Sequence, residues 1–165
     1  MPAGTSDEPP PPLVPAELGD RLDSVLCKLA DMVRREADQA FAPLGLRSGH
    51  HTLLRMVAGR GEQKQQALSS LLHVDPSTVV DIVDDLEERG PLVRRRNPID
   101  RRAHLIDLTP AGRVLLARAG EIAACPRPGA FAELSRREVG RLHQLLLRLG
   151  GSSTPSTNSP RGAAS

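Results

Sequence analysis

Between Leu68 and Gly112 the spacing of the apolar residues changes twice. It follows a helical period up to Gly90, alternates like a strand from Leu92, and becomes helical again after Thr109. Few folds place two short helices directly before a hairpin and a further helix. This segment therefore constrains the architecture more than any other part of the chain.

Two helices are predicted on either side of His73–Val74, a gap so short that it allows only a sharp turn. Asp75 is expected to cap the second helix, and Pro76 suits its first position, where a missing N–H has no helical partner to lose. Gly90 should end that helix in the left-handed conformation. The apolar stripes are Leu68, Leu71 and Leu72 in the first helix and Val79, Ile82, Val83 and Leu86 in the second. The pattern predicts a helix-turn-helix, whose second helix can enter a DNA major groove.

A β-hairpin is predicted after these two helices. Residues 92–96 and 103–108 form two strand-like runs, and the turn-rich residues 97–102 join them. Thr109 and Pro110 then provide a helix cap and a first-turn proline. A helix-turn-helix followed by a hairpin is a winged helix.

The residues of this region also occur in the order of a known signature. They are Ser77, Thr78, Val79, Asp84, Leu86, Glu87, Arg89, Gly90, Arg94, Asp100, Arg101, Arg102, Leu108, Thr109 and Gly112. In this order they resemble the MarR family of transcriptional regulators, and the resemblance covers about residues 17–149. It implies a mainly α fold with a small β-hairpin wing, in which N- and C-terminal helices form a dimerisation layer.

The flanking residues divide the chain into three parts. Residues 1–15 include the run Pro9–Pro12 and are expected to form a disordered arm, or else to bind a partner. Residues 16–149 form one MarR-like domain, with dimerisation helices at about 16–42 and 110–149 and the winged helix-turn-helix at about 48–109. Residues 150–165 are Gly, Ser, Thr and Pro without periodicity, which predicts a disordered tail.

Cap residues predict where the other helices begin. The long first helix is expected to open at Pro15–Glu17 and to end before Pro43. Ser48 is expected to cap the helix that follows. Residues 125–129 contain two prolines and a glycine, which preclude a continuous helix there. Ser135 and Glu138 have the spacing of a capping box for the last helix.

Charge is distributed unevenly, although the formal net charge is only +2. Asp75–Gly90 carries six acids and one base, a net −5, whereas Pro91–Arg118 carries seven arginines and two acids, a net +5. The basic hairpin is therefore the expected electrostatic contact with DNA, and the acidic helix is not. A solvated charge run is the alternative reading of the wing.

The resemblance implies a set of DNA-binding residues at the start of the second helix and on the wing. The full set is Ser69, Pro76, Ser77, Thr78, Asp81, Arg94, Arg95, Arg96, Arg101 and Arg102. Arg101 resembles the family arginine that enters the minor groove, and Asp100 is expected to pair with Arg102 and shape the wing tip. Asp81 and Asp85 depart from the family pattern, so affinity should come mainly from the wing. An ordinary capped surface turn is the alternative for the helix start.

An effector and a redox response are further implications of the resemblance. Arg47, His50, His51 and Arg55 are candidates for binding an anionic small molecule, although the two histidines are better interpreted as an exposed pair at a helix start. Cys27 resembles the reactive thiol of the organic hydroperoxide branch. A buried structural cysteine is the preferred interpretation, because the chain contains no tyrosine to pair with the thiol.

These observations predict a cytoplasmic, homodimeric repressor that binds double-stranded, pseudo-palindromic promoter or operator DNA and is released by a small molecule. The alternatives are a redox-sensing regulator acting through Cys27 and a winged-helix protein-interaction module with weak DNA binding. No HExxH motif, phosphate loop or Cys-rich metal cluster occurs, so no enzyme and no cofactor are predicted. No apolar run is long enough to predict a membrane span.

Overall fold

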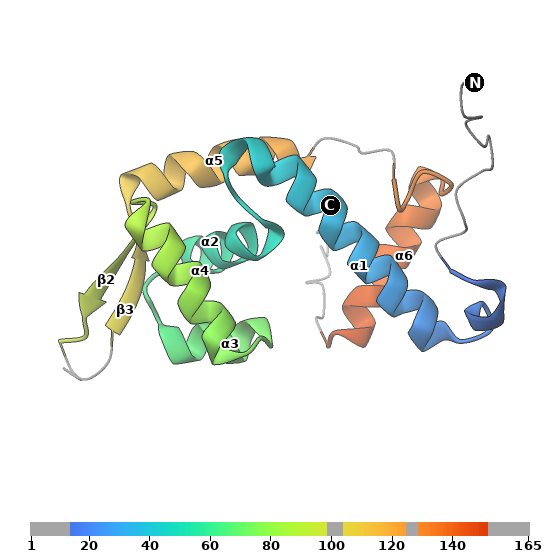
Figure 1. The fold of residues 1–165 in the computed structure, drawn as a ribbon, viewed down its shortest axis with the longest axis horizontal. Coiled ribbons are helices and arrows are strands. Elements are labelled where there is room, and N and C mark those ends of the chain that lie inside the picture. The colour runs from blue at the N-terminus through green and yellow to red at the C-terminus, as the bar shows by residue number, and fades with distance from the viewer. Residues whose placement is uncertain (1–13, 99–103, 125–128, 152–165) are drawn as a thin grey trace, which may run out of the picture. The chain divides into compact units, whose positions relative to one another are not determined.

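The computed structural model describes residues 14–98, 104–124 and 129–151. The chain divides into two compact units, Met1–Pro126 and Arg127–Ser165, which are described separately (Figure 1). The first unit contains five α-helices and a three-stranded sheet among its described residues. The predicted class, mainly helical with a small β wing, is confirmed.

The first long helix begins later than the sequence predicted. A short 3-10 helix, η1 (Ala16–Leu18), comes first, and α1 spans Leu22–Phe41 before a second 3-10 turn, η2 (Ala42–Leu44). Arg21 is extended, with φ −100° and ψ 100°, and its guanidinium lies 2.8 Å from the Asp23 carboxylate. The extended Arg21 therefore separates η1 from α1 and prevents one continuous helix.

Helix α2 (Ser48–Arg60) begins without the predicted serine cap, because Ser48 is already its first helical residue. The Ser48 N–H instead donates to Oδ1 of Asp38 on α1, at 2.6 Å. The N–H of Arg47 donates to Nδ1 of His50 at 3.0 Å. A carboxylate from another helix thus supplies the capping acceptor, which local sequence could not reveal.

The helix-turn-helix is confirmed as α3 (Gln65–Leu72) and α4 (Pro76–Glu88). His73 takes the left-handed conformation between them, with φ 52°. Pro76 opens α4 as predicted, but the Asp75 side chain makes no capping hydrogen bond, so that expectation is wrong. Gly90 has φ 91° and ends the segment as expected.

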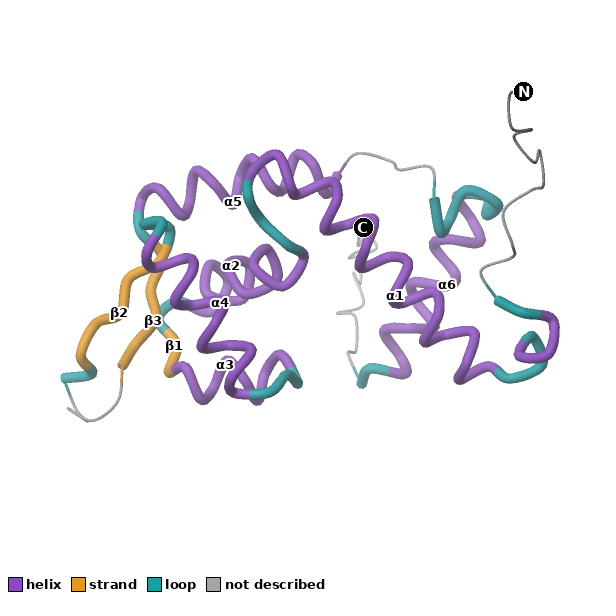
Figure 2. The backbone as a smooth tube through the Cα atoms, in the orientation of Figure 1, coloured by secondary structure: helices purple, strands orange, loops and turns teal. Residues whose placement is uncertain are grey.

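The wing consists of β2 (Leu92–Arg96) and β3 (His104–Leu108), which pair antiparallel with Leu92 opposite Leu108. A third strand, β1 (Gln63–Lys64), was not predicted, because two residues carry no periodicity. It pairs with β3 on the other edge, so the strand order is β1-β3-β2 (Figure 2). The sheet thereby connects the entry to α3 with the wing.

The core of this unit is aliphatic and lies between α2, α3, α4 and the sheet. Its most completely buried side chains are Leu53, Leu54, Leu68, Val79, Val83, Leu86, Ile106 and Ala119. Helix α5 (Pro110–Ala124) follows β3, and the Thr109 hydroxyl accepts from the Gly112 N–H at 3.0 Å as an N-cap. Gly112 packs so closely that a Cβ there would lie 2.1 Å from the Pro91 carbonyl oxygen.

The second unit contains helix α6 (Arg136–Leu149) among its described residues. The predicted capping box is present: the Ser135 hydroxyl accepts from the Glu138 N–H, and the Glu138 carboxylate accepts from the Ser135 N–H at 2.8 Å. Within residues 14–98, 104–124 and 129–151, no helix combines the length and apolar character needed to cross a membrane.

Candidate nucleic-acid interface

The N-terminal end of α4 is an exposed polar surface. Pro76, Ser77 and Thr78 are all exposed, and so is Asp81 one turn later. Val79 and Val83 are fully buried and hold the opposite side of the helix against the core. Free N–H groups at a helix start, together with short hydroxyl side chains, suit phosphate oxygens and base acceptors. The geometry at these positions agrees with the predicted role, which itself stays a prediction.

Ser69 does not belong to this surface. It is 7% exposed within α3, and its hydroxyl donates to the Gln65 carbonyl oxygen at 3.5 Å. Its own carbonyl accepts from Val74 in the turn. Ser69 therefore packs inside the helix-turn-helix, and its contact with DNA stays a prediction that these contacts do not support.

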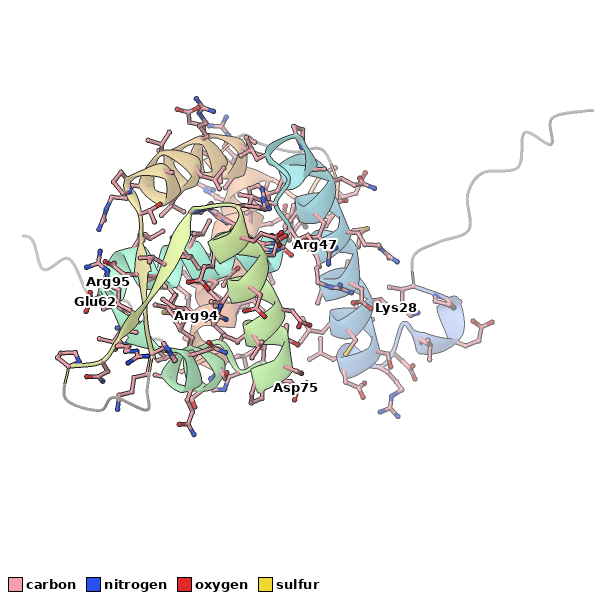
Figure 3. The ribbon with its side chains drawn as sticks, turned by 60° about the vertical axis from the view of Figure 1, so that its left-hand side comes forward. Lys28, Arg47, Glu62, Asp75, Arg94 and Arg95 are labelled. Atoms are coloured by element: carbon pink, nitrogen blue, oxygen red, sulfur yellow. The ribbon has the colours of Figure 1, made fainter. Side chains whose placement is uncertain are left out.

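Arg94 is engaged inside the protein. Its guanidinium pairs with Asp84 and Glu87 of α4, and its Nε lies 3.4 Å from the Gln65 amide oxygen. The Arg94 N–H also donates to Glu87 at 2.8 Å. Figure 3 shows Arg94 between the wing strand and α4. The predicted DNA contact remains untested, but the observed contacts make Arg94 a link between the wing and α4.

These contacts change the ionisation of the groups involved. Burial raises the pKa of Glu87, but the hydrogen bonds from the Arg94 N–H and guanidinium outweigh it and hold that pKa below its usual value. Burial opposes the charge on Arg94, yet its two carboxylate partners raise its pKa overall. Glu87 and Arg94 are therefore both charged at neutral pH.

Asp85 is held from the other side of α4. Arg89 pairs with it at 2.9 Å and donates to the carbonyl oxygens of Gly45 and Leu44, and Nε2 of His50 lies 3.2 Å from the same carboxylate. The i, i+4 spacing of Asp85 and Arg89 was visible in the sequence. The contacts to His50 and to the loop were not, because they join distant segments.

Two wing arginines remain exposed. Arg95 has a 60% exposed side chain, and its ion pairs with described residues are long, 3.9 Å to Glu62 and 3.7 Å to Asp107 (Figure 3). Arg96, at the end of β2, is also exposed. The predicted residues Asp100, Arg101 and Arg102 lie outside the described residues. Within the described part of the wing, Arg95 and Arg96 are thus the arginines that face solvent.

His50 and His51 were expected to be exposed, and both are buried, at 7% and 8%. Since Nδ1 of His50 accepts from Arg47, the neutral ring carries its hydrogen on Nε2, toward Asp85. Burial lowers the pKa of His50; Asp85 opposes this shift and Arg47 reinforces it. His51 packs on the Phe41 ring at a centroid distance of 4.7 Å.

The four predicted effector residues divide between two cavities of the first unit. Arg47 and His50 line a cavity of about 470 Å³ between α1, α2 and α4. His51 and Arg55 line another, of about 610 Å³, between α2 and α5. The first is also lined by Thr78 and Asp81, so it reaches the exposed polar surface at the start of α4.

Cys27 differs from the expected buried cysteine, because it is exposed on α1. It lies in a shallow cavity with Lys28, Asp23 and Asp31. Cys125 lies outside the described residues. Among the residues that the structure describes, no group of three or more His, Cys, Asp or Glu side chains could hold a metal ion.

A helix-turn-helix with an exposed recognition-helix start, joined to an antiparallel wing with outward-facing arginines, defines a winged-helix protein of the transcription-regulator type. The model of the MarR family matches residues 46–104. The chain belongs to the MarR family.

Individual relatives agree with this assignment. The chain is 36% identical over 105 residues to a Thauera aromatica protein named as the transcriptional regulator of the hcr operon, covering 64% of this chain and 63% of that relative. It is 33% identical over 106 residues to the regulator YkoM of Bacillus subtilis, covering 64% and 69%. The match thus spans slightly less than two thirds of the first relative.

Solved structures of one repressor are also similar. CouR bound to a 23-mer DNA duplex is 29% identical, with a TM-score of 0.74 over 82% of this chain and 96% of CouR. CouR from Rhodococcus jostii RHA1 bound to p-coumaroyl-CoA is 28% identical, with a TM-score of 0.65 over 84% and 98%.

Proposed function

We propose that this protein is a sequence-specific, DNA-binding transcriptional repressor that acts as a homodimer and is released by a small molecule. The observation that carries the proposal is the exposed start of α4, Pro76–Thr78, with the core-facing side of the helix fixed by Val79 and Val83. A recognition helix held in this way can present its first turn to base edges. The similarity to CouR, a transcriptional repressor bound to a 23-mer DNA duplex, supports DNA binding by this chain.

The homodimer is supported by apolar side chains that the chain leaves exposed. Leu22 and Leu26 of α1 are 80% and 47% exposed, and Leu149 of α6 is 79% exposed. Monomeric proteins rarely expose rows of leucine, so a second copy is the proposed partner for each helix. Two copies would present two α4 helices, which fits a pseudo-palindromic operator.

The effector is proposed to be an anionic small molecule in the cavity between α1, α2 and α4. Arg34 and Arg47 line it and would bind the anion, and Thr78 and Asp81 line it too. Two further carboxylates of the lining, Asp38 and Asp85, are already engaged by the Ser48 N–H and by Arg89. A ligand there would touch both the helix that carries the proposed dimer contacts and the helix that reads DNA. CouR, with its acyl-CoA ligand, supports an anionic effector for this chain.

The test is fluorescence anisotropy of the purified protein with the promoter DNA beside its own gene and with random DNA, over several salt concentrations. We expect the promoter to bind more tightly, with log affinity falling by about 0.9 per phosphate contact for each unit of log salt. Thr78→Ala should relax the sequence preference, whereas Arg101→Ala should weaken binding to all sequences and flatten the salt dependence. Equal affinity for promoter and random DNA would favour the protein-interaction module instead.

A redox-sensing regulator is the second candidate, because the Cys27 thiol is exposed. Mass analysis of the denatured protein after mild peroxide treatment tests it. A sulfenate or disulfide at Cys27, together with loss of DNA binding, would support this candidate. An unmodified Cys27 would eliminate it.

A further inference from the structure

The acidic recognition helix contains a carboxylate that the internal ion pairs leave available. Of the acids in the second half of α4, Asp84 and Glu87 pair with Arg94, and Asp85 pairs with Arg89 and His50. The positive charges of Arg94 and Arg89 thus offset part of the negative charge of these three acids, and the neutral His50 ring adds a hydrogen-bonding contact to Asp85. The electrostatic objection to an acidic helix in the major groove is therefore smaller than the sequence suggests.

Asp81 is different from these three residues. It is exposed and makes no ion pair with any residue that the structure describes. It follows Ser77 by four positions and Thr78 by three, so the three side chains lie on one face of α4. That face is opposite to the buried Val79 and Val83. Asp81 therefore lies at the centre of the surface that α4 would present to a groove.

A carboxylate in a major groove can only accept hydrogen bonds. The donors available there are the exocyclic amino groups, N4 of cytosine and N6 of adenine, whereas guanine presents only acceptors. Phosphate oxygens repel the same carboxylate, so Asp81 adds nothing to non-specific binding. The Asp81 carboxylate would therefore bind DNA favourably only beside the exocyclic amino group of a cytosine or an adenine.

We propose that Asp81 is a specificity-determining residue that accepts a hydrogen bond from the exocyclic amino group of a cytosine or adenine in each half-site and rejects guanine there. This inference rests on the proposed DNA-binding function. Glu88 provides a matched control, because it is also exposed and free of ion pairs among the described residues. It lies in the last turn of α4, away from the helix start that enters the groove.

The experiment is selection of bound duplexes from a DNA library with randomised positions, using the full-length wild-type protein, Asp81→Ala, Asp81→Asn and Glu88→Ala. Wild type should select cytosine or adenine at one position of each half-site. Asp81→Ala should lose that preference alone, with the affinity for the selected site falling about tenfold. Asp81→Asn should favour adenine, because an amide can pair with both N6 and N7. Glu88→Ala should leave the selected sequence unchanged.

Two other outcomes would overturn the assignment in distinguishable ways. If Asp81→Ala and Glu88→Ala tighten binding to every sequence by the same factor and select the wild-type sequence, Asp81 is only a repelling charge and the proposed function stands. If wild type selects no sequence at all, the proposed function itself fails. Circular dichroism of each variant checks that the helices are intact.

Discussion

Arg94→Gln should weaken the side-chain link between the wing and α4. The substitution removes a guanidinium that pairs with Asp84 and Glu87, and it weakens the contact to Gln65. The Arg94 N–H bond to Glu87 remains, since it belongs to the backbone. The variant therefore tests the side-chain link and not the strand itself.

The magnitude follows from the exposure of the three side chains, which is 22% for Arg94, 35% for Glu87 and 56% for Asp84. The Asp84 pair is more than half exposed, so solvent screening limits it to less than about 1 kcal/mol. The Glu87 pair is a charge-assisted hydrogen bond in a drier position, and about 1–2 kcal/mol is reasonable after the same discount. We expect Arg94→Gln to lower the free energy of unfolding by about 2 kcal/mol.

Urea unfolding at equal protein concentration measures this loss, and for a domain of this size the midpoint should fall by about 1 M. The effect should depend on pH. Because Arg94 holds the pKa of Glu87 below its ordinary value of 4.5, the stabilisation is present above that pH and is lost as the pH falls through the lowered pKa. The difference between wild type and variant should therefore shrink below about pH 4.5.

A double-mutant cycle with Glu87→Gln provides the control. If the two residues interact as observed, the double variant should be more stable than the sum of the single losses predicts, by about 1 kcal/mol. Additive losses, or an unchanged midpoint in Arg94→Gln, would refute the reasoning that this arginine connects β2 to α4.

Two further predictions concern packing and pH. Gly112→Ala should destabilise the protein by at least about 2 kcal/mol, because its Cβ would meet the Pro91 oxygen, whereas Gly120→Ala on the same helix has open space and should be neutral or slightly stabilising in thermal unfolding. Burial lowers the pKa of His50 in the folded protein, so the unfolded chain binds a proton at this residue more readily. The free energy of unfolding should therefore decrease as the pH falls below about 6.5, by at most about 1.4 kcal/mol per pH unit. His50→Gln should remove that slope in urea titrations between about pH 7.5 and pH 5.5; an identical slope would contradict the assignment.

Local signals were sufficient for the helix-turn-helix and the wing. Pro76 marks the start of α4, and the alternation from Leu92 to Arg96 matches β2. Each of these features depends on residues within one turn or one strand. Their physical causes are the missing N–H of proline and the two-residue period of a strand.

Contacts between distant segments were not predictable in this way. Strand β1 exists only because Gln63 pairs with Ile106, and the start of α2 is capped by Asp38 from the preceding helix. The sequence around His50 predicts an exposed polar residue, because the sequence does not show that Asp85 of α4 lies beside the ring. The burial of His50 and His51 at the start of α2 was not predicted for the same reason, since Asp85 and Phe41, which they contact, belong to other helices.

The same long-range contacts reduce the number of wing arginines that are free to contact phosphates. The sequence presents an acidic helix followed by a basic wing, yet Arg94 faces the acids of α4, and Arg89 faces Asp85 and the loop before α2. Arg94 would release no counterions from DNA while it holds those partners, so the net charge of the wing overstates the number of phosphate contacts expected of it. The exposed Arg95 and Arg96 are the described wing side chains available for them. We therefore expect affinity and sequence preference to be carried by different residues, while Arg94 fixes the wing against α4.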